Sequence, residues 1–205
     1  MRLILALCLS LASLTSAYAS ETPAIRTLTA DEIARLKEGD TIVTAAGRTP
    51  VRGEVIGLIR APVDQLAPIL VDYPNITRWA PATEDLVVVG TDGDATLIEG
   101  RTVLPLLTDR TWRMRSRASW QTLGGKRAFV YRFDHVPGTG NINTSFGYWV
   151  LYTLDEDPAY TYVRYVANAD PGIAIPSGVL RFVTSRALPD LIEGLRDRHA
   201  VLHSR

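Results

Sequence analysis

The sequence has 205 residues, with 22 basic and 22 acidic side chains and a pI near 6.8. This balance excludes the strongly basic character that is normal for a nucleic-acid-binding domain. The single cysteine, Cys8, lies in the first apolar segment, so the chain that follows it has no thiol for a disulfide or for a cysteine-ligated metal.

Residues 1–19 have the features of a secretory signal peptide. One arginine precedes an apolar run over residues 3–14, and small residues stand two apart at Ala17 and Ala19. The run is shorter than the roughly 20 apolar residues that span a bilayer, which disfavours an uncleaved anchor. The sequence therefore predicts cleavage after Ala19, a periplasmic or secreted location, and a single domain over residues 20–205.

The first part of this domain predicts two short helices and one strand. In residues 28–40, Thr29 precedes a glutamate by three positions, which is a capping-box spacing at the start of a helix. Residues 50–62 read as a strand. Residues 62–73 begin with a proline that suits a first helical turn, although Pro68 then lies inside the predicted helix.

Residues 84–168 predict consecutive strands joined by short, glycine-rich turns. Strands connected this closely pair in an antiparallel meander, because parallel pairing needs long crossover segments. Residues 110–120 alternate clearly, and one face carries Trp112, Met114, Ser116, Ala118 and Trp120. The other face carries Arg113, Arg115 and Arg117. We expect this arginine row to be a solvated face matched to carboxylates on a neighbouring strand; docking to an anionic lipid or an acidic partner is the alternative.

The C-terminal part predicts a long amphipathic helix that starts near Pro176. Its apolar residues recur at spacings of three and four, at Val179, Leu180, Val183, Ala187, Leu188, Leu191, Ile192 and Leu195. Pro189 lies in the middle of this pattern, where it removes a backbone hydrogen bond and bends the helix. The bend is either a fixed kink or a hinge for ligand entry. A long helix with one apolar face beside an antiparallel sheet indicates an α+β domain.

Four phrases, in this order and spacing, resemble the START-related (SRPBCC) superfamily, which includes polyketide-cyclase-like and coenzyme-Q-binding proteins. They are "GEVIGLIRAPVDQLAPILVDYPNITRWAP" at 53–81, "LPLLTDRTW" at 104–112, "GYWVLYTL" at 147–154 and "ADPGIAIPSGVLRFVTSRALPDLIEGLR" at 169–196. The resemblance implies a helix-grip fold, in which a curved antiparallel sheet wraps around a long C-terminal helix and small helices lie near the N-terminus. It also implies an apolar cavity that holds a lipid or a similar molecule.

Aromatic and apolar residues are the first candidates for lining such a cavity, because flat side chains offer a large contact area. Ordinary sheet core is the alternative interpretation for each. The predicted ligand-binding residues are Trp79, Trp112, Met114, Phe133, Trp149, Leu151, Val163, Tyr165, Val183, Ala187 and Leu191. Further aromatic candidates are Phe129, Tyr131 and Tyr162.

Three polar residues, Asp109, Arg110 and His135, are candidates for contact with a ligand head group. The alternatives are an ion pair of Asp109 with Arg110 that holds a turn, and a strand-end position for His135. Adjacent residues of a strand point to opposite faces, so Asp134 cannot orient His135 as a catalytic base. The chain's three histidines lack the spacing of a metal site, and no cofactor or catalytic motif is predicted.

The leading hypothesis is an exported, non-enzymatic carrier or sensor whose partner is a hydrophobic small molecule. A lipid, a sterol-like compound, a quinone or a polyketide would fit, and transient contact with a membrane surface is a further expectation. The alternative is a cyclase- or dehydratase-type enzyme that uses His135, Tyr131 or Asp109 in the same cavity. A third hypothesis is an interaction module whose cavity has collapsed.

Overall fold

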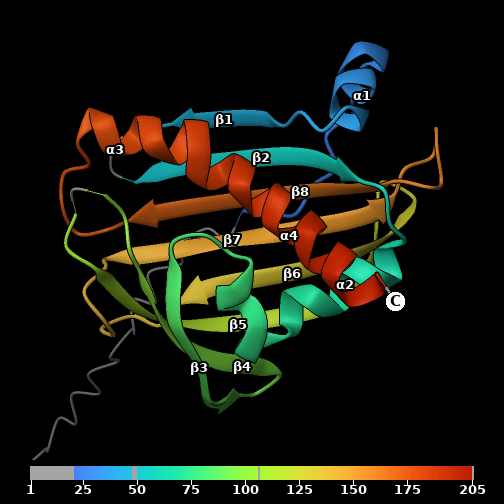
Figure 1. Ribbon diagram of the computed structural model, residues 1–205. Helices are drawn as coiled ribbons and strands as arrows, with labels where there is room; N and C mark the ends of the chain where they lie inside the picture. Colours follow the sequence, from blue (N-terminus) through green and yellow to red (C-terminus); the bar gives the residue numbers. More distant parts are fainter. Residues whose placement is uncertain (1–20, 48–49, 106, 205) are drawn as a thin grey trace, which may run out of the picture.

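The computed structural model describes residues 21–47, 50–105 and 107–204 (Figure 1). The predicted signal peptide, residues 1–19, lies outside the described residues, so its cleavage stays a prediction. Within the described part, no helix combines the length and the apolar character that crossing a membrane would require.

An eight-stranded antiparallel sheet forms the body of the domain, with the strand order β1-β2-β8-β7-β6-β5-β4-β3. The predicted meander is confirmed, since β3 to β8 follow one another in space as in sequence. The pairing of β2 with β8 places an early strand of the domain beside its last strand. The strands are β1 (Ile42–Ala46), β2 (Val51–Ile59), β3 (Thr83–Asp92), β4 (Ala95–Thr102), β5 (Arg110–Leu123), β6 (Lys126–His135), β7 (Thr144–Thr153) and β8 (Thr161–Asp170).

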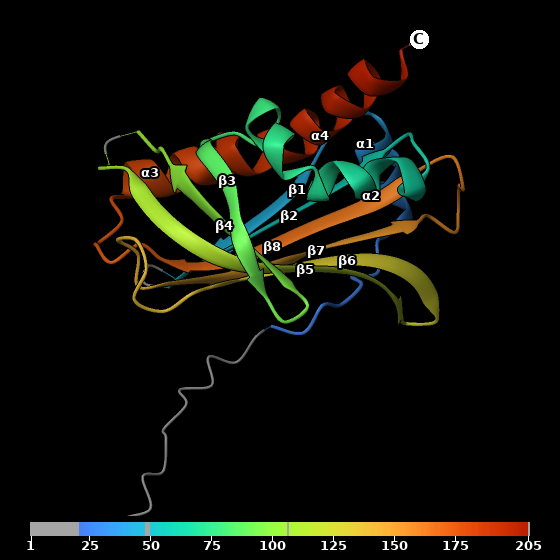
Figure 2. The same ribbon diagram turned by 90° about the horizontal axis from the view of Figure 1, so that it is seen from below.

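The long C-terminal helix crosses one face of this curved sheet, and α2 and η1 cover the same face (Figures 1 and 2). This arrangement confirms the predicted α+β helix-grip fold. The capping box that begins α1 at Thr29 is also confirmed. The helices are α1 (Ala30–Lys37), α2 (Val63–Val71), the 3-10 helix η1 (Tyr73–Arg78), α3 (Ser177–Phe182), the π-helical turn η2 (Val183–Ala187) and α4 (Leu188–His203).

The C-terminal helix differs from the prediction at Pro189. The helical backbone runs without a break from Ser177 to His203, so Pro189 does lie in its middle, but the π-helical turn η2 stands just before it. There the Leu188 N–H donates to the carbonyl oxygen of Val183, five residues back. A proline has no N–H to donate to the preceding turn, and in an α-helix its ring crowds the carbonyl group four residues back. The π-helical turn therefore accommodates Pro189 without breaking the helix.

Glycines allow α4 to approach its neighbours closely. A Cβ atom on Gly57 of β2 would lie 2.5 Å from Cγ2 of Ile192, and one on Gly53 would lie 3.2 Å from Cδ1 of Leu188. On the helix itself, a Cβ on Gly194 would lie 2.0 Å from the carbonyl oxygen of Trp79, at the end of η1. Because glycine has no side chain, α4 packs closely against both the sheet and η1 at these positions.

The outer face of the sheet is covered by the first described residues and by α1. Ile25, Leu28, Ile33 and Leu36 pack there against apolar side chains of β2, β6, β7 and β8. Beside this second core, the Glu54 carboxylate accepts hydrogen bonds from Arg164 (2.9 Å) and Arg52 (2.8 Å). Arg52 also pairs with Glu21, and Arg164 donates to the carbonyl oxygen of Ala24. Buried and partly exposed charges thus attach the N-terminal segment to the sheet.

The arginine row of β5 lies on this outer face farther along the sheet, and its predicted pairing with neighbouring carboxylates is confirmed. Arg113 pairs with Glu99 of β4, while Arg115 and Arg117 pair with acids of the β3–β4 hairpin and with Asp134 of β6. Partly exposed pairs of this kind contribute little to stability, about 1 kcal/mol or less each. The row is charge-compensated within the protein.

Candidate ligand-binding site

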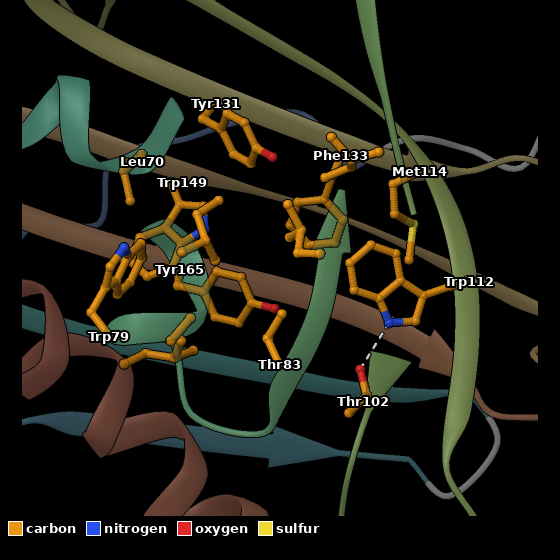
Figure 3. Close-up of a pocket in the computed structure, with 15 residues that line it drawn as sticks. Leu70, Trp79, Thr83, Thr102, Trp112, Met114, Tyr131, Phe133, Trp149 and Tyr165 are labelled. Atoms are coloured by element: carbon orange, nitrogen blue, oxygen red, sulfur yellow. Dashed lines mark hydrogen bonds between the residues drawn. The ribbon is translucent and has the colours of Figure 1, made fainter. Parts of the chain in front are cut away.

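Between the sheet and the helices lies a cavity of about 180 Å³, which we call the aromatic pocket (Figure 3). Its walls come from α2, η1, strands β3 to β8 and α4. Seven of the residues predicted to bind ligand line it: Trp79, Trp112, Met114, Phe133, Trp149, Tyr165 and Leu191. Leu70, Ile76, Ala80, Thr83, Leu86, Ile98, Thr102 and Tyr131 complete the lining.

Aromatic rings in contact with one another form the floor of this pocket. The Trp149 and Tyr165 ring centroids lie 4.7 Å apart, and Phe133 stacks on Tyr165 at 6.0 Å. Trp79 meets Trp149 edge to face at 6.1 Å. Such pairs are worth roughly 1 kcal/mol each beyond their burial. The floor is therefore a continuous surface of packed aromatic rings.

Trp112 is held in place by a glycine and a hydrogen bond. Gly100 pairs with it across β4 and β5, and a Cβ atom there would lie 2.6 Å from the indole ring. The Trp112 Nε1–H donates to Oγ1 of Thr102 at 2.9 Å (Figure 3). These two contacts fix the position of the indole beside β4.

The two tyrosine hydroxyl groups at the aromatic pocket are protonated and do not act as bases. Burial raises the pKa of Tyr131 and of Tyr165 far above the usual value for tyrosine, so both phenols are neutral at physiological pH. Next to Tyr131, the Tyr73 hydroxyl and Ser116 Oγ are 2.8 Å apart, and Ser116 donates to the carbonyl oxygen of Thr96. The buried Trp79 Nε1–H has no hydrogen-bond partner among the described residues.

A second cavity of about 210 Å³, the loop pocket, adjoins the first. The two share Thr102, Trp112 and Tyr165 as lining residues. The loop pocket includes Val183, as the sequence predicted, and its other apolar walls are Val51, Leu104, Leu107, Ile142, Ala167, Ala169, Pro171, Ile175 and Leu188. Several of these belong to connections between strands, where no periodic pattern marks an inward-facing side chain, and the sequence analysis missed them.

Three predicted residues do not line either pocket. Leu151 and Val163 lie on the correct face of the sheet but are completely buried in the core, in one cluster with Leu66 and Ile192. Ala187 lies in η2 and is partly buried. Of the further aromatic candidates, Tyr131 lines the aromatic pocket, Phe129 is buried in the core, and Tyr162 lies in the separate core on the outer face.

The three polar candidates have different surroundings. Asp109 pairs with Arg101 of β4, so the ion pair expected between Asp109 and Arg110 is replaced by a cross-strand pair. Arg110 lines the loop pocket, where it donates to Oγ1 of Thr108 at 3.0 Å. His135 is the last residue of β6, in agreement with the alternative prediction of a strand-end position. Its Nε2–H donates to the carbonyl oxygen of Thr139 at 2.8 Å. It is buried and lines neither pocket.

Among the described residues, no three histidine, cysteine or acidic side chains gather in an arrangement that could hold a metal ion. The cavity instead offers apolar walls, a few hydroxyl groups and, in the loop pocket, the charged side chains Arg110 and Asp170. This donor set suits a largely apolar molecule with a small polar group.

No protein-family model matches the sequence, and no curated protein is significantly similar to it. Solved structures do share its fold. A STAR-related lipid transfer protein from Xanthomonas axonopodis matches with a TM-score of 0.62 and 18% identity, over 78% of this chain and 92% of the other. Human StAR-related lipid transfer protein 5 matches with a TM-score of 0.62 and 11% identity, over 84% and 94%.

The di-domain aromatase/cyclase StfQ of the steffimycin biosynthetic pathway matches with a TM-score of 0.51 and 20% identity. That match covers 74% of this chain and 46% of StfQ. The resemblance inferred from the four sequence phrases is thus confirmed at the level of the fold. The chain has the helix-grip fold of START-related lipid-transfer domains and polyketide aromatase/cyclases.

Proposed function

We propose that this domain is an exported carrier or sensor that binds one hydrophobic small molecule in the joined aromatic and loop pockets. The observation that carries the proposal is the aromatic floor of Phe133, Trp149 and Tyr165 beneath the C-terminal helix. The lipid transfer proteins of the same fold support it. A lipid, a sterol-like compound, a quinone or a polyketide has the apolar surface that such walls accommodate.

The driving force for binding comes from removing apolar ligand surface from water. At about 25 cal/mol per Å², a ligand that buries roughly 300 Å² of apolar surface gains about 7 kcal/mol before the costs of association. Each pocket alone is small for a lipid, whereas their combined volume falls within the size range of ligand sites, roughly 300–1,000 Å³. We therefore propose that the ligand extends past Trp112 and occupies both pockets.

Binding accounts for these side chains better than catalysis does. The cyclase or dehydratase alternative uses Tyr131, His135 or Asp109. Burial keeps Tyr131 protonated, while His135 and Asp109 are engaged by Thr139 and Arg101 and line neither pocket. A general base needs a lone pair within reach of the substrate. The neutral hydroxyl of Tyr131 is too weak a base for this role, and His135 and Asp109 are not within the cavity.

Filling the aromatic pocket should abolish ligand binding. Leu191 projects into this pocket from α4, so Leu191→Trp places a large side chain where the ligand would lie. We expect at least a tenfold loss of affinity for an apolar fluorescent probe, and loss of any lipid that mass spectrometry detects in the purified protein. The measurement is a titration of the probe, combined with lipid extraction.

The matched control is Leu202→Trp, the same change near the end of the same helix, where the leucine is 46% exposed. This variant should bind the probe like the unaltered protein. Equal binding by Leu191→Trp and the unaltered protein would contradict the proposed site. Failure of every protein to bind any member of a lipid panel would instead favour the interaction module.

Export and membrane contact belong to the same proposal. The N-terminal sequence of protein recovered from the cell envelope or the medium should start at Ser20. The predicted cut leaves Glu21, which pairs with Arg52, within the mature chain. A mature protein that retains residues 1–19 would contradict cleavage.

Ligand exchange should be faster in the presence of lipid vesicles if the domain contacts a membrane surface.

A further inference from the structure

The loop pocket combines apolar walls with one cationic side chain. Among the described residues that line the two pockets, Arg110 carries the positive charge. It begins β5 and shares the inward face with Trp112 and Met114, because side chains two apart along a strand point the same way. Arg110 and Trp112 therefore both line the loop pocket.

The charge of Arg110 is not compensated within the described part of the protein. No carboxylate of the described residues lies within 4.0 Å of it, whereas the neighbouring Asp109 is taken by Arg101. Its terminal amino group donates to Thr108, and its Nε is buried without an acceptor among the described residues. This contrasts with Arg113, Arg115 and Arg117 of the same strand, each of which pairs with an acid.

Asp170 lines the same pocket, and its carboxylate is already engaged. One oxygen accepts a hydrogen bond from the backbone N–H of Gly172 at 2.9 Å, and the other accepts from Nδ2 of Asn143 at 3.1 Å. These contacts link the segment that precedes β7 to the segment that follows β8. Asp170 thus stabilises the rim of the pocket, and Arg110 retains unused hydrogen-bonding capacity.

A guanidinium at the edge of an apolar cavity favours a ligand with an anionic group. Charge-assisted hydrogen bonds from arginine to a carboxylate are stronger than bonds between neutral groups. We propose that the ligand is an amphiphile with a carboxylate head, which binds Arg110 in the loop pocket while the apolar tail passes Trp112 into the aromatic pocket. This inference rests on the proposed function and narrows it from hydrophobic molecules in general to apolar carboxylic acids.

A series of head groups on one tail tests the inference with the unaltered protein. Dodecanoate, methyl dodecanoate and dodecanol share an apolar chain, and only the first is charged at neutral pH. We expect dodecanoate to bind about 10- to 100-fold more tightly than the ester or the alcohol, as one charge-assisted hydrogen bond allows. Isothermal titration calorimetry of the mature chain measures the three affinities.

Arg110→Gln should remove most of this preference, by lowering the affinity for dodecanoate much more than the affinity for the methyl ester, and Arg110→Lys should retain part of it. The control is Arg60→Gln. This change also removes one positive charge, at an exposed residue that directly follows β2. Thermal unfolding checks that the variants are folded. If Arg110→Gln does not fold, the head-group series and Arg110→Lys decide the question.

Equal affinity for the acid and the ester in the unaltered protein would overturn the inference and leave the proposed function intact. A preference for the acid that survives in Arg110→Gln would overturn the role of Arg110. Absence of binding for all three probes and for a broader lipid panel would overturn the proposed function, and this inference with it.

Discussion

Gly194→Ala is expected to destabilise the domain by about 3 kcal/mol, although alanine normally stabilises a helix relative to glycine by about 1 kcal/mol. The added Cβ would lie 2.0 Å from the carbonyl oxygen of Trp79, and that oxygen belongs to the backbone and cannot rotate away. Either α4 or η1 has to move. Urea denaturation, monitored by tryptophan fluorescence, measures the free energy of unfolding.

The matched control is Gly178→Ala in α3, where an added Cβ has no atom within 4 Å. This variant should be as stable as the unaltered protein or slightly more stable. Because Trp79 lines the aromatic pocket, Gly194→Ala should also weaken binding of an apolar probe. A stabilising effect at both positions would show that α4 does not approach η1 as closely as described.

Glu54→Gln is expected to cost about 3 kcal/mol of stability at neutral pH. Glu54 and Arg164 form an ion pair in which each side chain is 10% exposed, and Arg52 also donates to the same carboxylate. Removing one member of a buried pair leaves the other charge without compensation. The control is Glu99→Gln, whose pair with Arg113 is about 40% exposed and which should lose less than about 1 kcal/mol.

The same cluster predicts how stability depends on pH. Burial raises the pKa of Glu54, but hydrogen bonds from Arg164 and Arg52 outweigh burial, so the pKa is lowered from its ordinary value of 4.5. The hydrogen bond from Arg52 likewise lowers the pKa of Glu21. A carboxyl group with a lowered pKa in the folded state contributes stability above pH 4.5, and this contribution disappears as pH falls through the folded pKa.

The free energy of unfolding should therefore decline below about pH 4.5 in the unaltered protein. In Glu54→Gln this decline should be shallower, because the variant has already lost the titrating group. Urea denaturation at a series of pH values compares the two proteins. Parallel pH curves would show that Glu54 does not contribute to the acid sensitivity.

Much of the fold could be predicted from local patterns. Alternation along β5 placed Trp112 and Met114 on the inner face and the arginine row on the outer face, and the structure agrees. The three- and four-residue spacing in the C-terminal segment identified Leu188, Ile192 and Leu195 as buried. Short turns excluded crossover helices and so required antiparallel pairing. Each of these inferences depends only on neighbours along the chain.

The candidate site was predicted less completely, because a repeating pattern identifies the face of a strand but not the element that covers it. Trp149 and Leu151 share a face of β7, yet Trp149 lines the aromatic pocket and Leu151 is in the solid core. The short strand β1 and the helix η1 were not predicted. The sequence pattern could have placed Arg110 on the inner face, because it stands two residues before Trp112 and side chains two apart on a strand point the same way.

The sequence by itself determined the antiparallel sheet, the long amphipathic helix and the inner face of most strands, because strand and helix periodicities are local properties of the chain. Only the tertiary structure decided which inward residues border empty space, that Arg101 and not Arg110 pairs with Asp109, and that a π-helical turn accommodates Pro189. These features depend on contacts between residues far apart in the chain, on strand register and on where glycines allow α4 to approach, and no local pattern encodes them.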